Sequence, residues 1–558
     1  VADVVGTAAD EVEDVAQRSP GNGTDLPEAD AQQARGVARQ AIPCRAEDIA
    51  ADDAPQNLAR GGHQQIFHLI HGGLGGRVAR RIGGHQRFDA AVVGGQILHI
   101  VQHAVVPQIA RDIVEDEAVD LAFFAGVTII YRAKSKIRVK AKFTKRFTRI
   151  FAVGFLFFCA INACVFFLAK RFNLLAYALP ITAISVTLIP LSLIFGAAIN
   201  YPYDRIKYLL TIRGAKKKLS ENKNLKVIFV TGSFGKTTTK RYLYELLKDD
   251  YKTVATPKSF NTPIGICLSI KDINADTQIF IAEAGARRVG DIKTLCKIVR
   301  PDISVVTGIA PQHIETFGAV ENIIAEKEEA VKNLKVGGFA VISGETVGGK
   351  TIYERAKCDK ISVGSGETAD VKFRNVKFSA YGSSFDIMCG EKTLEITAPF
   401  VGIHNVVDFT LAAAVAIKLG VRAEKIENVA KTLTPPKHRF SVSVSGNGVT
   451  IIDDGYNANI EGIKSGAESL KYFGGKKFAV FSGIVEGGTK SYELNSEAGR
   501  VLSENCDRLI AVGRLADEIL SCAKGERTED LDGAKEILKK EVRRGDTVAF
   551  FSDLPDRY

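Results

Sequence analysis

The sequence predicts an α/β protein in which two parallel-sheet domains follow a pair of apolar, membrane-spanning helices. Three observations support this fold class. Apolar β-branched segments alternate with amphipathic helical patterns over residues 225–433 and again over 437–558. A strand, a glycine turn and a helix start follow one another at 227–240. Two long uncharged runs occupy 150–169 and 174–199.

The segment 227–240, which reads VIFVTGSFGKTTTK, predicts an ATP-binding phosphate loop. Backbone N–H groups of a glycine turn can surround phosphate oxygens, and the following helix N-terminus adds positive potential. Lys236 can reach the β- and γ-phosphates, and the Thr237 hydroxyl can hold Mg²⁺. The predicted nucleotide contacts of the loop are Thr231, Gly232, Ser233, Phe234, Gly235, Lys236, Thr237 and Thr238. A chance Gly/Thr turn is the alternative.

Only two residues separate Gly232 from Gly235, whereas the general phosphate loop has four between its glycines. Six further segments follow in order. They are Ser259–Gly265 (SFNTPIG), Ile281–Ala286 (IAEAGA), Thr307–Glu315 with Ala325–Glu328, Gly402–Asn405 (GIHN), and Asp453–Asn459 (DDGYNAN). Beyond Tyr131 the chain has three histidines: His313 and His404 lie inside these segments, and His438 lies in a further one, Lys437–Phe440 (KHRF).

This ordered set resembles the Mur ligase superfamily, from Leu225 to the C-terminus. The DDGYNAN segment is most similar to the branch that adds D-alanyl-D-alanine to UDP-MurNAc-tripeptide during peptidoglycan synthesis. The resemblance implies a central P-loop ATPase domain and a C-terminal Rossmann-like domain. It also implies an acid–amino-acid ligase that forms ADP and activates the carboxylate as an acyl phosphate. Phosphoryl transfer of this kind depends on positioning and on neutralising the charge shared by two anions.

The resemblance also assigns roles to single residues. Glu283, His313 and a carbamylated Lys327 would hold a second Mg²⁺, since a carbamate supplies the oxygen ligands that a hard cation prefers. Lys236, Lys327 and His313 form the predicted catalytic set. Asn405 would contact adenine, Asp454 the ribose and Arg439 the γ-phosphate. The predicted substrate contacts are Ser259, Asn261, Thr262, Tyr456, Asn457 and Asn459.

Each residue has a simpler interpretation when it is taken alone. Glu283 would be a solvated charge at a strand end, Lys327 a surface lysine of a charged helix, and the histidines turn residues. Their joint order favours the functional interpretation.

Departures from the family pattern leave the substrate open. Ile460 stands where the last signature usually has Pro, and the end of the chain lacks the family's Lys-Gly-Ser-Arg element. The usual UDP-sugar-binding domain is not recognisable. A lipid-linked or other acidic precursor is therefore an alternative substrate, and a catalytically silent membrane scaffold is an alternative function. A transporter ATPase fits poorly, because the ABC signature is missing and two spans are too few.

Charge and hydropathy predict a membrane protein with cytoplasmic catalytic domains, and the resemblance implies that this membrane is the bacterial plasma membrane. Nine Lys/Arg and no acidic residue lie between Arg132 and Arg149, and a second basic cluster covers 205–218. Positive flanks on both sides of the uncharged runs place both ends in the cytoplasm. A buried core hairpin is the alternative. Because the basic flanks lack interleaved aromatic residues, anionic lipid is the expected partner and nucleic acid is not.

Residues 1–130 differ in composition from the rest: they contain 10 Arg and no Lys, 18 acidic residues and six of the nine histidines. Their histidine spacings match no standard metal site. We expect this segment to be spurious or poorly ordered. The nine cysteines of the chain form no C-x-x-C pair, which argues against a zinc ribbon.

We therefore expect five segments. They are 1–131 (atypical), 132–200 (basic flank and hairpin), 201–224 (basic, partly helical linker), 225–434 (ATP-binding domain) and 435–558 (C-terminal domain). A β-rich insertion is expected around 360–399, and strands of the C-terminal domain near 449–453, 477–481, 508–512 and 547–551.

Overall fold

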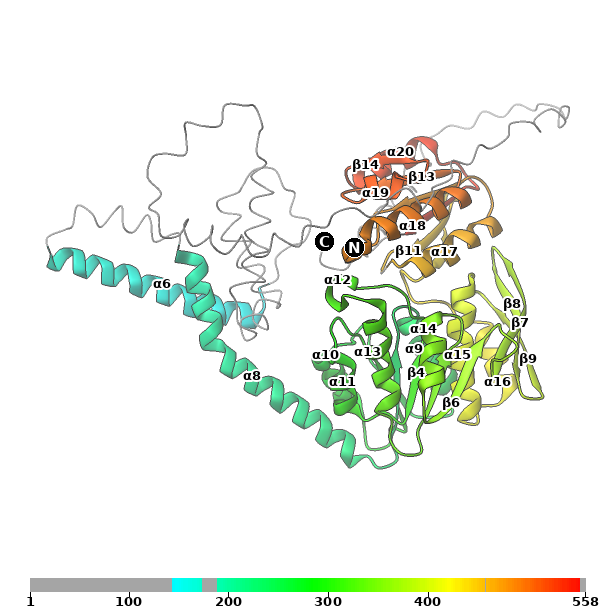
Figure 1. Ribbon diagram of the computed structural model, residues 1–558, viewed down its shortest axis with the longest axis horizontal. Helices are drawn as coiled ribbons and strands as arrows, with labels where there is room; N and C mark the ends of the chain where they lie inside the picture. Colours follow the sequence, from blue (N-terminus) through cyan, green and yellow to red (C-terminus); the bar gives the residue numbers. More distant parts are fainter. Residues whose placement is uncertain (1–142, 173–187, 457, 552–558) are drawn as a thin grey trace, which may run out of the picture. The chain divides into compact units, whose positions relative to one another are not determined.

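The structure is a computed structural model that describes residues 143–172, 188–456 and 458–551 (Figure 1). The chain divides between Tyr203 and Asp204 into two units, which are treated separately. Several predictions lie outside the described residues: the segment 1–131, most of the first basic flank, residues 174–187 of the second apolar run, and Asn457.

The N-terminal unit contains two long helices, α6 (Lys145–Arg171) and the start of α8 (Ile189–Glu221). Their backbones pack closely through glycines. A Cβ atom on Gly154 would lie 2.7 Å from the Ser192 carbonyl oxygen, and one on Gly196 would lie 2.4 Å from that of Ile150. Phe157 stacks on Phe195 with ring centroids 3.9 Å apart. Small residues that allow such close approach are typical of helix pairs in membranes.

Of the helices in the described ranges, α6 alone is long and apolar enough to cross a bilayer, by length and composition. Many of its large apolar side chains are exposed, among them Phe155 and Phe167. The first predicted span, 150–169, therefore lies within one helix. The second run is described from residue 188 onward; α8 begins at Ile189 and continues without a break through the predicted linker to Glu221. One helix that could cross a membrane is thus described, and the two-helix hairpin stays a prediction.

The central domain is built on a nine-stranded sheet of order β2-β3-β1-β4-β5-β6-β7-β8-β9. Strands β2 to β7 of this order pair in parallel, and β8 and β9 join antiparallel. The strands are β1 (Lys226–Thr231), β2 (Thr253–Ala255), β3 (Ile279–Glu283), β4 (Ile303–Val306), β5 (Phe339–Ser343), β6 (Asp359–Gly364), β7 (Val371–Ser379), β8 (Gly382–Cys389) and β9 (Lys392–Ala398). Residues 360–399, which the sequence suggests as a β-rich insertion, therefore extend the edge of the same sheet.

Helices cover both faces of the central sheet, because its parallel strands are apolar on both sides. One core lies under α9 (Lys236–Leu247), α15 (Ile403–Lys418) and α16 (Ala423–Ala430). The other core lies under α11 (Asp291–Val299), α13 (Val320–Lys332) and α14 (Val347–Arg355). The remaining short elements are α10 (Pro263–Ser269), η2 (Ile270–Asp272) and α12 (Ile314–Phe317).

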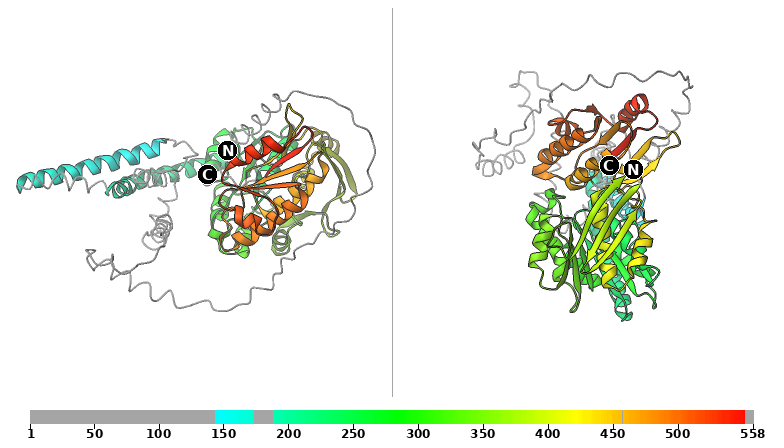
Figure 2. Two further views of the ribbon diagram at one scale, coloured as in Figure 1. Left: turned by 90° about the horizontal axis from the view of Figure 1, so that it is seen from above. Right: turned by 90° about the vertical axis from the view of Figure 1, so that its right-hand side faces the viewer.

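The C-terminal domain has a six-stranded sheet of order β10-β11-β15-β12-β13-β14, parallel except for β10. Its strands are β10 (Ser441–Val444), β11 (Thr450–Asp454), β12 (Lys477–Phe481), β13 (Arg508–Val512), β14 (Glu526–Thr528) and β15 (Thr547–Phe551). Its helices are α17 (Ile460–Ser469), η3 (Leu470–Tyr472), η4 (Gly488–Lys490), α18 (Ser491–Asn505), α19 (Ala516–Leu520) and α20 (Leu531–Glu541). Figure 2 shows helices on both sides of this orange-to-red sheet.

Candidate active site

The phosphate loop connects the end of β1 to the start of α9 and is shaped by two glycines with positive φ, Gly232 (φ 153°) and Gly235 (φ 79°). At Gly235 a Cβ atom would lie 2.2 Å from the Asp408 carboxylate, so both backbone angle and space require glycine. Lys236 folds back over the loop, where its Nζ donates to the carbonyl oxygens of Gly232 (2.9 Å) and Ser233 (2.8 Å). The ammonium group is therefore held beside the backbone of the phosphate loop.

Two hydroxyls of the loop hold it in place. The Thr231 Oγ1 donates to the Ala284 carbonyl (3.1 Å), and the Ser233 Oγ donates to the Ala310 carbonyl (3.0 Å). Both side chains are buried, so they tie the loop to the ends of the neighbouring strands. We therefore expect nucleotide contacts of these two residues to come from the backbone.

Glu283, at the end of β3, lies at the centre of a buried polar cluster with 1% of its surface exposed. Its Oε1 accepts hydrogen bonds from the Thr237 hydroxyl (3.2 Å) and from the Asn261 amide (3.4 Å). Its Oε2 lies 2.9 Å from the buried Lys240 Nζ. The cluster brings together residues that the sequence assigns separately to metal and substrate, and it adds Lys240, which the sequence reasoning missed. In the sequence, Lys240 is one of several Thr and Lys residues at the start of a helix, and this local pattern does not mark it as a site residue.

Lys327 lies on α13 with 3% of its surface exposed, so it is not the surface lysine that its charged helix suggests. Burial, followed by the nearby charge of Lys236, lowers the pKa of Lys327 to about 7. Near neutral pH, a large fraction of the protein molecules therefore carries Lys327 as the neutral amine. Neutral amines react with carbon dioxide to form carbamates.

His313 precedes α12 in a left-handed conformation (φ 54°), and its Nδ1 contacts the Glu486 carboxylate of the C-terminal domain. Glu486 is also left-handed (φ 59°) and lies in the glycine-rich turn after β12. Sequence reasoning missed Glu486, although an acidic residue among glycines at the carboxyl end of a parallel strand is a usable signal.

The resemblance implies magnesium ions, so the side chains of the site can be tested as magnesium ligands. Within the described ranges, no group of three or more His, Cys, Asp and Glu side chains lies close enough together to hold a metal. The Thr237 hydroxyl and the Glu283 carboxylate, 3.2 Å apart, are oxygen donors of the kind that Mg²⁺ prefers. These two residues fit one hard cation beside the phosphate loop.

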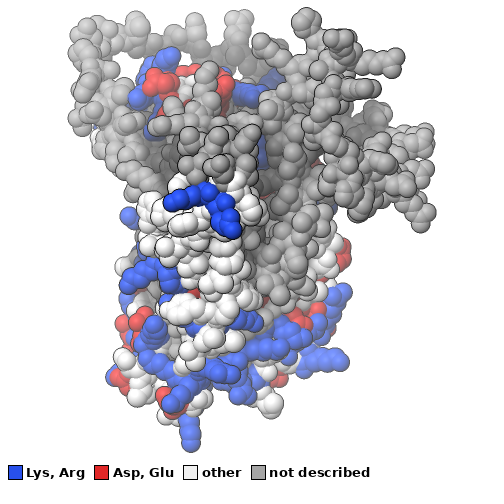
Figure 3. Space-filling view, turned by 90° about the vertical axis from the view of Figure 1, so that its left-hand side faces the viewer, with Lys and Arg blue, Asp and Glu red and all other residues white. Residues whose placement is uncertain are grey.

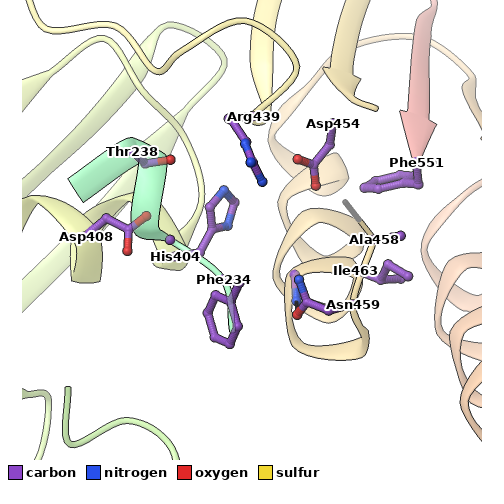
Figure 4. Close-up of a pocket in the computed structure, with 12 residues that line it drawn as sticks. Phe234, Thr238, His404, Asp408, Arg439, Asp454, Ala458, Asn459, Ile463 and Phe551 are labelled. Atoms are coloured by element: carbon purple, nitrogen blue, oxygen red, sulfur yellow. Dashed lines mark hydrogen bonds between the residues drawn. The ribbon is translucent and has the colours of Figure 1, made fainter. Parts of the chain in front are cut away.

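A pocket opens between the phosphate loop and the C-terminal domain (Figure 4). Phe234, Gly235, Thr238, His404 and Asp408 line it from the central domain. The lining residues of the C-terminal domain are Arg439, Asp454, Ala458, Asn459, Gly462, Ile463 and Phe551. Five of the nucleotide contacts predicted from the sequence thus meet in one cavity: Phe234, Gly235, Thr238, Arg439 and Asp454.

Arg439 connects the two domains across this pocket. Its guanidinium donates to the Thr237 hydroxyl (3.4 Å) and lies 4.2 Å from the ring centroid of Tyr456. Asp454, at the end of β11, accepts from the Phe440 N–H (3.1 Å), and burial raises its pKa to about 6 against the opposing charge of Arg439. A cation for phosphate and a carboxylate for hydroxyl groups therefore face the loop from the C-terminal domain.

Asn405 and His404 differ in their access to the pocket. Asn405 is fully buried, its Oδ1 accepts from the Tyr242 hydroxyl (3.1 Å) and its Nδ2 donates to the Val401 carbonyl (2.9 Å). His404 lines the pocket, and its Nδ1 lies 2.7 Å from the Ser465 hydroxyl. Burial lowers the pKa of His404 to about 4, so its ring is neutral. The contact of Asn405 with adenine stays a prediction. His404 lines the pocket and is therefore the better-placed candidate for a contact with the nucleotide.

The predicted substrate residues divide into structural and accessible ones. Thr262 caps α10 by accepting from the Gly265 N–H (3.2 Å), and Asn459 caps α17 by accepting from the Gly462 N–H (2.9 Å). Asn261 binds Glu283, Ser259 is half-buried, and Tyr456 supports Arg439. Their roles toward substrate stay predictions.

Comparison with known proteins agrees with this arrangement. The Mur ligase middle domain matches residues 230–416, and the Mur ligase glutamate ligase domain matches residues 438–554. Together they cover more than half of the chain. The chain belongs to the Mur ligase family.

Individual Mur ligases show the same likeness. The UDP-N-acetylmuramoyl-tripeptide–D-alanyl-D-alanine ligase of Bacillus subtilis is 29% identical over 353 residues, which is 61% of this chain and 76% of that protein. The ligase of the same name from Haemophilus influenzae is 26% identical over 346 residues, 60% of this chain and 74% of the relative.

Solved structures extend the likeness to three dimensions. The crystal structure of MurF from Acinetobacter baumannii is 28% identical with a TM-score of 0.58, covering 63% of this chain and 78% of that one. MurF from Thermotoga maritima in complex with ADP is also 28% identical, with a TM-score of 0.56 over 63% and 80% of the two chains. The predicted family, the α/β fold and the enzyme class, an ATP-dependent ADP-forming ligase, are therefore confirmed.

Proposed function

We propose that this Mur ligase joins D-alanyl-D-alanine to the free carboxylate of UDP-MurNAc-tripeptide with hydrolysis of ATP to ADP and phosphate. The observation that carries the proposal is the pocket in which Arg439 reaches Thr237 at the phosphate loop. One domain supplies the loop that cradles the phosphates, and the other supplies the cation that faces it. The names of the relatives support the choice of substrates.

The reaction proceeds in two steps that these side chains can assist. An oxygen of the tripeptide carboxylate attacks the γ-phosphorus, the bond to the ADP oxygen breaks, and an acyl phosphate forms. The amine of the dipeptide then attacks the acyl carbon, inorganic phosphate leaves, and the amine loses one proton. Lys236 at the phosphate loop and Arg439 from the C-terminal domain would both stabilise the charge of the transferred group.

We propose that Lys327 acts as a carbamate. Its amine adds to carbon dioxide and releases one proton, and the resulting anion would offer oxygen ligands to a second Mg²⁺, for which the resemblance implies Glu283 and His313 as further ligands. Magnesium supplies charge neutralisation at the phosphates. The lowered pKa of about 7 supports this role, because an amine that is partly neutral is available to react.

We also propose that the enzyme works at the bacterial plasma membrane, with the catalytic domains in the cytoplasm. The length and apolar composition of α6 and its close packing on α8 support this location. The names of the relatives specify a nucleotide-linked precursor as the substrate. A lipid-linked precursor is the alternative that a membrane location would allow.

The test uses the full chain in detergent, with UDP-MurNAc-tripeptide, D-alanyl-D-alanine, ATP and Mg²⁺, and measures phosphate release together with the pentapeptide product. Release should require both substrates and should vanish in Lys327→Ala. Lys332→Ala is the matched control, since Lys332 lies on the same helix but its side chain is 52% exposed. Product formed equally by Lys327→Ala would refute the carbamate role. If the protein binds ATP but forms no product with either the nucleotide-linked or a lipid-linked substrate, the catalytically silent scaffold would be the function that remains.

A further inference from the structure

The C-terminal part of α8, residues 204–221, has two different faces. On one face Ala215 is buried, and Ile212 and Leu219 pack against the core of the central domain. Lys218 Nζ donates to the Lys271 carbonyl oxygen (2.6 Å). These contacts fix the helix on the central domain, so the position of its other face relative to that domain is defined.

The opposite face exposes large apolar side chains. Ile206 and Leu210 are each 58% exposed, and Leu209 is 41% exposed. Because residues three and four apart are neighbours on a helix, these side chains form one stripe. Single exposed apolar residues are ordinary on protein surfaces, but an exposed stripe on a helix marks a binding surface.

Basic residues surround this stripe. The exposed ones are Arg205, Lys207, Arg213, Lys216 and Lys217, and the sequence has no Asp or Glu from Arg205 to Ser220. The space-filling view of this side shows Lys and Arg gathered over its lower half (Figure 3). We call residues 205–217 on the exposed side the α8 basic face.

We propose that the α8 basic face binds the surface of an anionic lipid bilayer. An apolar stripe flanked by lysine and arginine is the pattern of helices that lie in the membrane interface: the apolar side chains enter the acyl boundary and the cations meet lipid phosphates. A nucleic acid would match the charge but not the exposed Ile206, Leu209 and Leu210. The inference does not depend on the proposed substrates.

The consequence is a second membrane attachment within the catalytic part of the chain. Because this part of α8 packs on the central domain, its contact with lipid would hold that domain at the bilayer surface. Salt should weaken the attachment, since the cationic part of the interaction is screened by ions.

The chain contains no tryptophan, so Leu210→Trp places a single fluorescent probe in the α8 basic face. The full chain would be reconstituted into nanodiscs of phosphatidylcholine alone or of phosphatidylcholine with phosphatidylglycerol. We expect the emission of the introduced tryptophan to shift to shorter wavelength, and brominated lipid to quench it, in the anionic discs. Tyr492→Trp is the control probe, because Tyr492 on α18 is 61% exposed and lies outside this face. Its emission should be the same in both kinds of disc.

Charge reversal then separates this face from general electrostatics. Arg213→Glu/Lys216→Glu/Lys217→Glu, introduced beside Leu210→Trp, should abolish the emission shift. Lys377→Glu/Lys392→Glu/Lys540→Glu changes the net charge equally at exposed positions on other elements and should preserve it. Equal emission in neutral and anionic discs, or a shift that survives the first triple substitution, would overturn the proposal. A general loss of folding would be recognised because ATP binding would fall as well.

Discussion

The phosphate loop and the His313–Glu486 contact are two parts of one site that are built in different ways. The loop is a single stretch of chain between β1 and α9, and its lysine is held by its own carbonyl groups. The His313 contact joins two domains and uses left-handed backbone on both sides. The first is therefore a local property of the sequence, while the second exists only when the two domains meet. Substitutions in each part should differ accordingly in size and kind.

The largest effect is expected for Lys236→Met. The substitution removes the ammonium group that the loop itself holds, and with it the charge that we propose stabilises the transferred phosphoryl group. We expect kcat/KM to fall about 100- to 1000-fold, the range for loss of one pre-positioned hydrogen-bond donor to developing negative charge. Steady-state phosphate release measures kcat/KM. Lys248→Met is the control, because Lys248 lies at the C-terminal end of the same helix and is exposed. A loss smaller than tenfold would mean that the loop lysine is not at the phosphates.

Gly235→Ala tests the shape of the loop. A Cβ atom there would collide with the Asp408 carboxylate at 2.2 Å in addition to the strain of a left-handed φ of 79°. Gly290→Ala is the matched control, since Gly290 has a φ of 97° and no atom within 4 Å of the added Cβ. We expect the control to lose about 1 kcal/mol of unfolding free energy and Gly235→Ala clearly more, with loss of ATP binding. Chemical denaturation measures the unfolding free energy, and nucleotide titration measures ATP binding. Equal losses of unfolding free energy in Gly235→Ala and Gly290→Ala would show that the Asp408 side chain moves aside freely.

The pH dependence of ATP binding tests Asp454. Burial raises its pKa from 3.8 to about 6, so the folded protein takes up this proton more readily than the unfolded chain does. The buried anion therefore destabilises the fold as pH rises through about 6, whereas the ribose contact predicted for Asp454 would require that anion. At pH 5 about one tenth of the carboxyl remains ionised, and we expect ATP affinity to fall about tenfold from pH 7.5. Asp454→Asn should bind ATP weakly and without this pH dependence; an unchanged pH profile would exclude the carboxylate from binding.

The smallest effect is expected for Glu486→Gln. The substitution keeps the shape of the side chain and weakens its contact with His313, so we expect a loss of about threefold to tenfold in kcat with little change in KM for ATP. Glu493→Gln, on α18 of the same domain, is the control. A change in the KM for ATP alone would show that Glu486 acts on nucleotide binding and not on His313.

Part of the architecture could be read directly from the sequence. The phosphate loop, β12, β13 and β15 lie where the sequence placed them, because local apolar runs and glycine turns decide such elements. The segment 360–399 was harder: its strands are alternating and exposed on one side, which looks like a separate insertion, but backbone pairing joins them to the central sheet.

The sequence by itself determined the phosphate loop, the order of the ligase motifs and the apolar helix α6, because each depends on residues close together in the chain. Tertiary structure alone decided the environment of distant residues. It buried Lys327 and lowered its pKa, enclosed Asn405 behind Tyr242, and brought Glu486 to His313. Desolvation and pairing across domains depend on which surfaces meet in space, and no local pattern of residues carries that information.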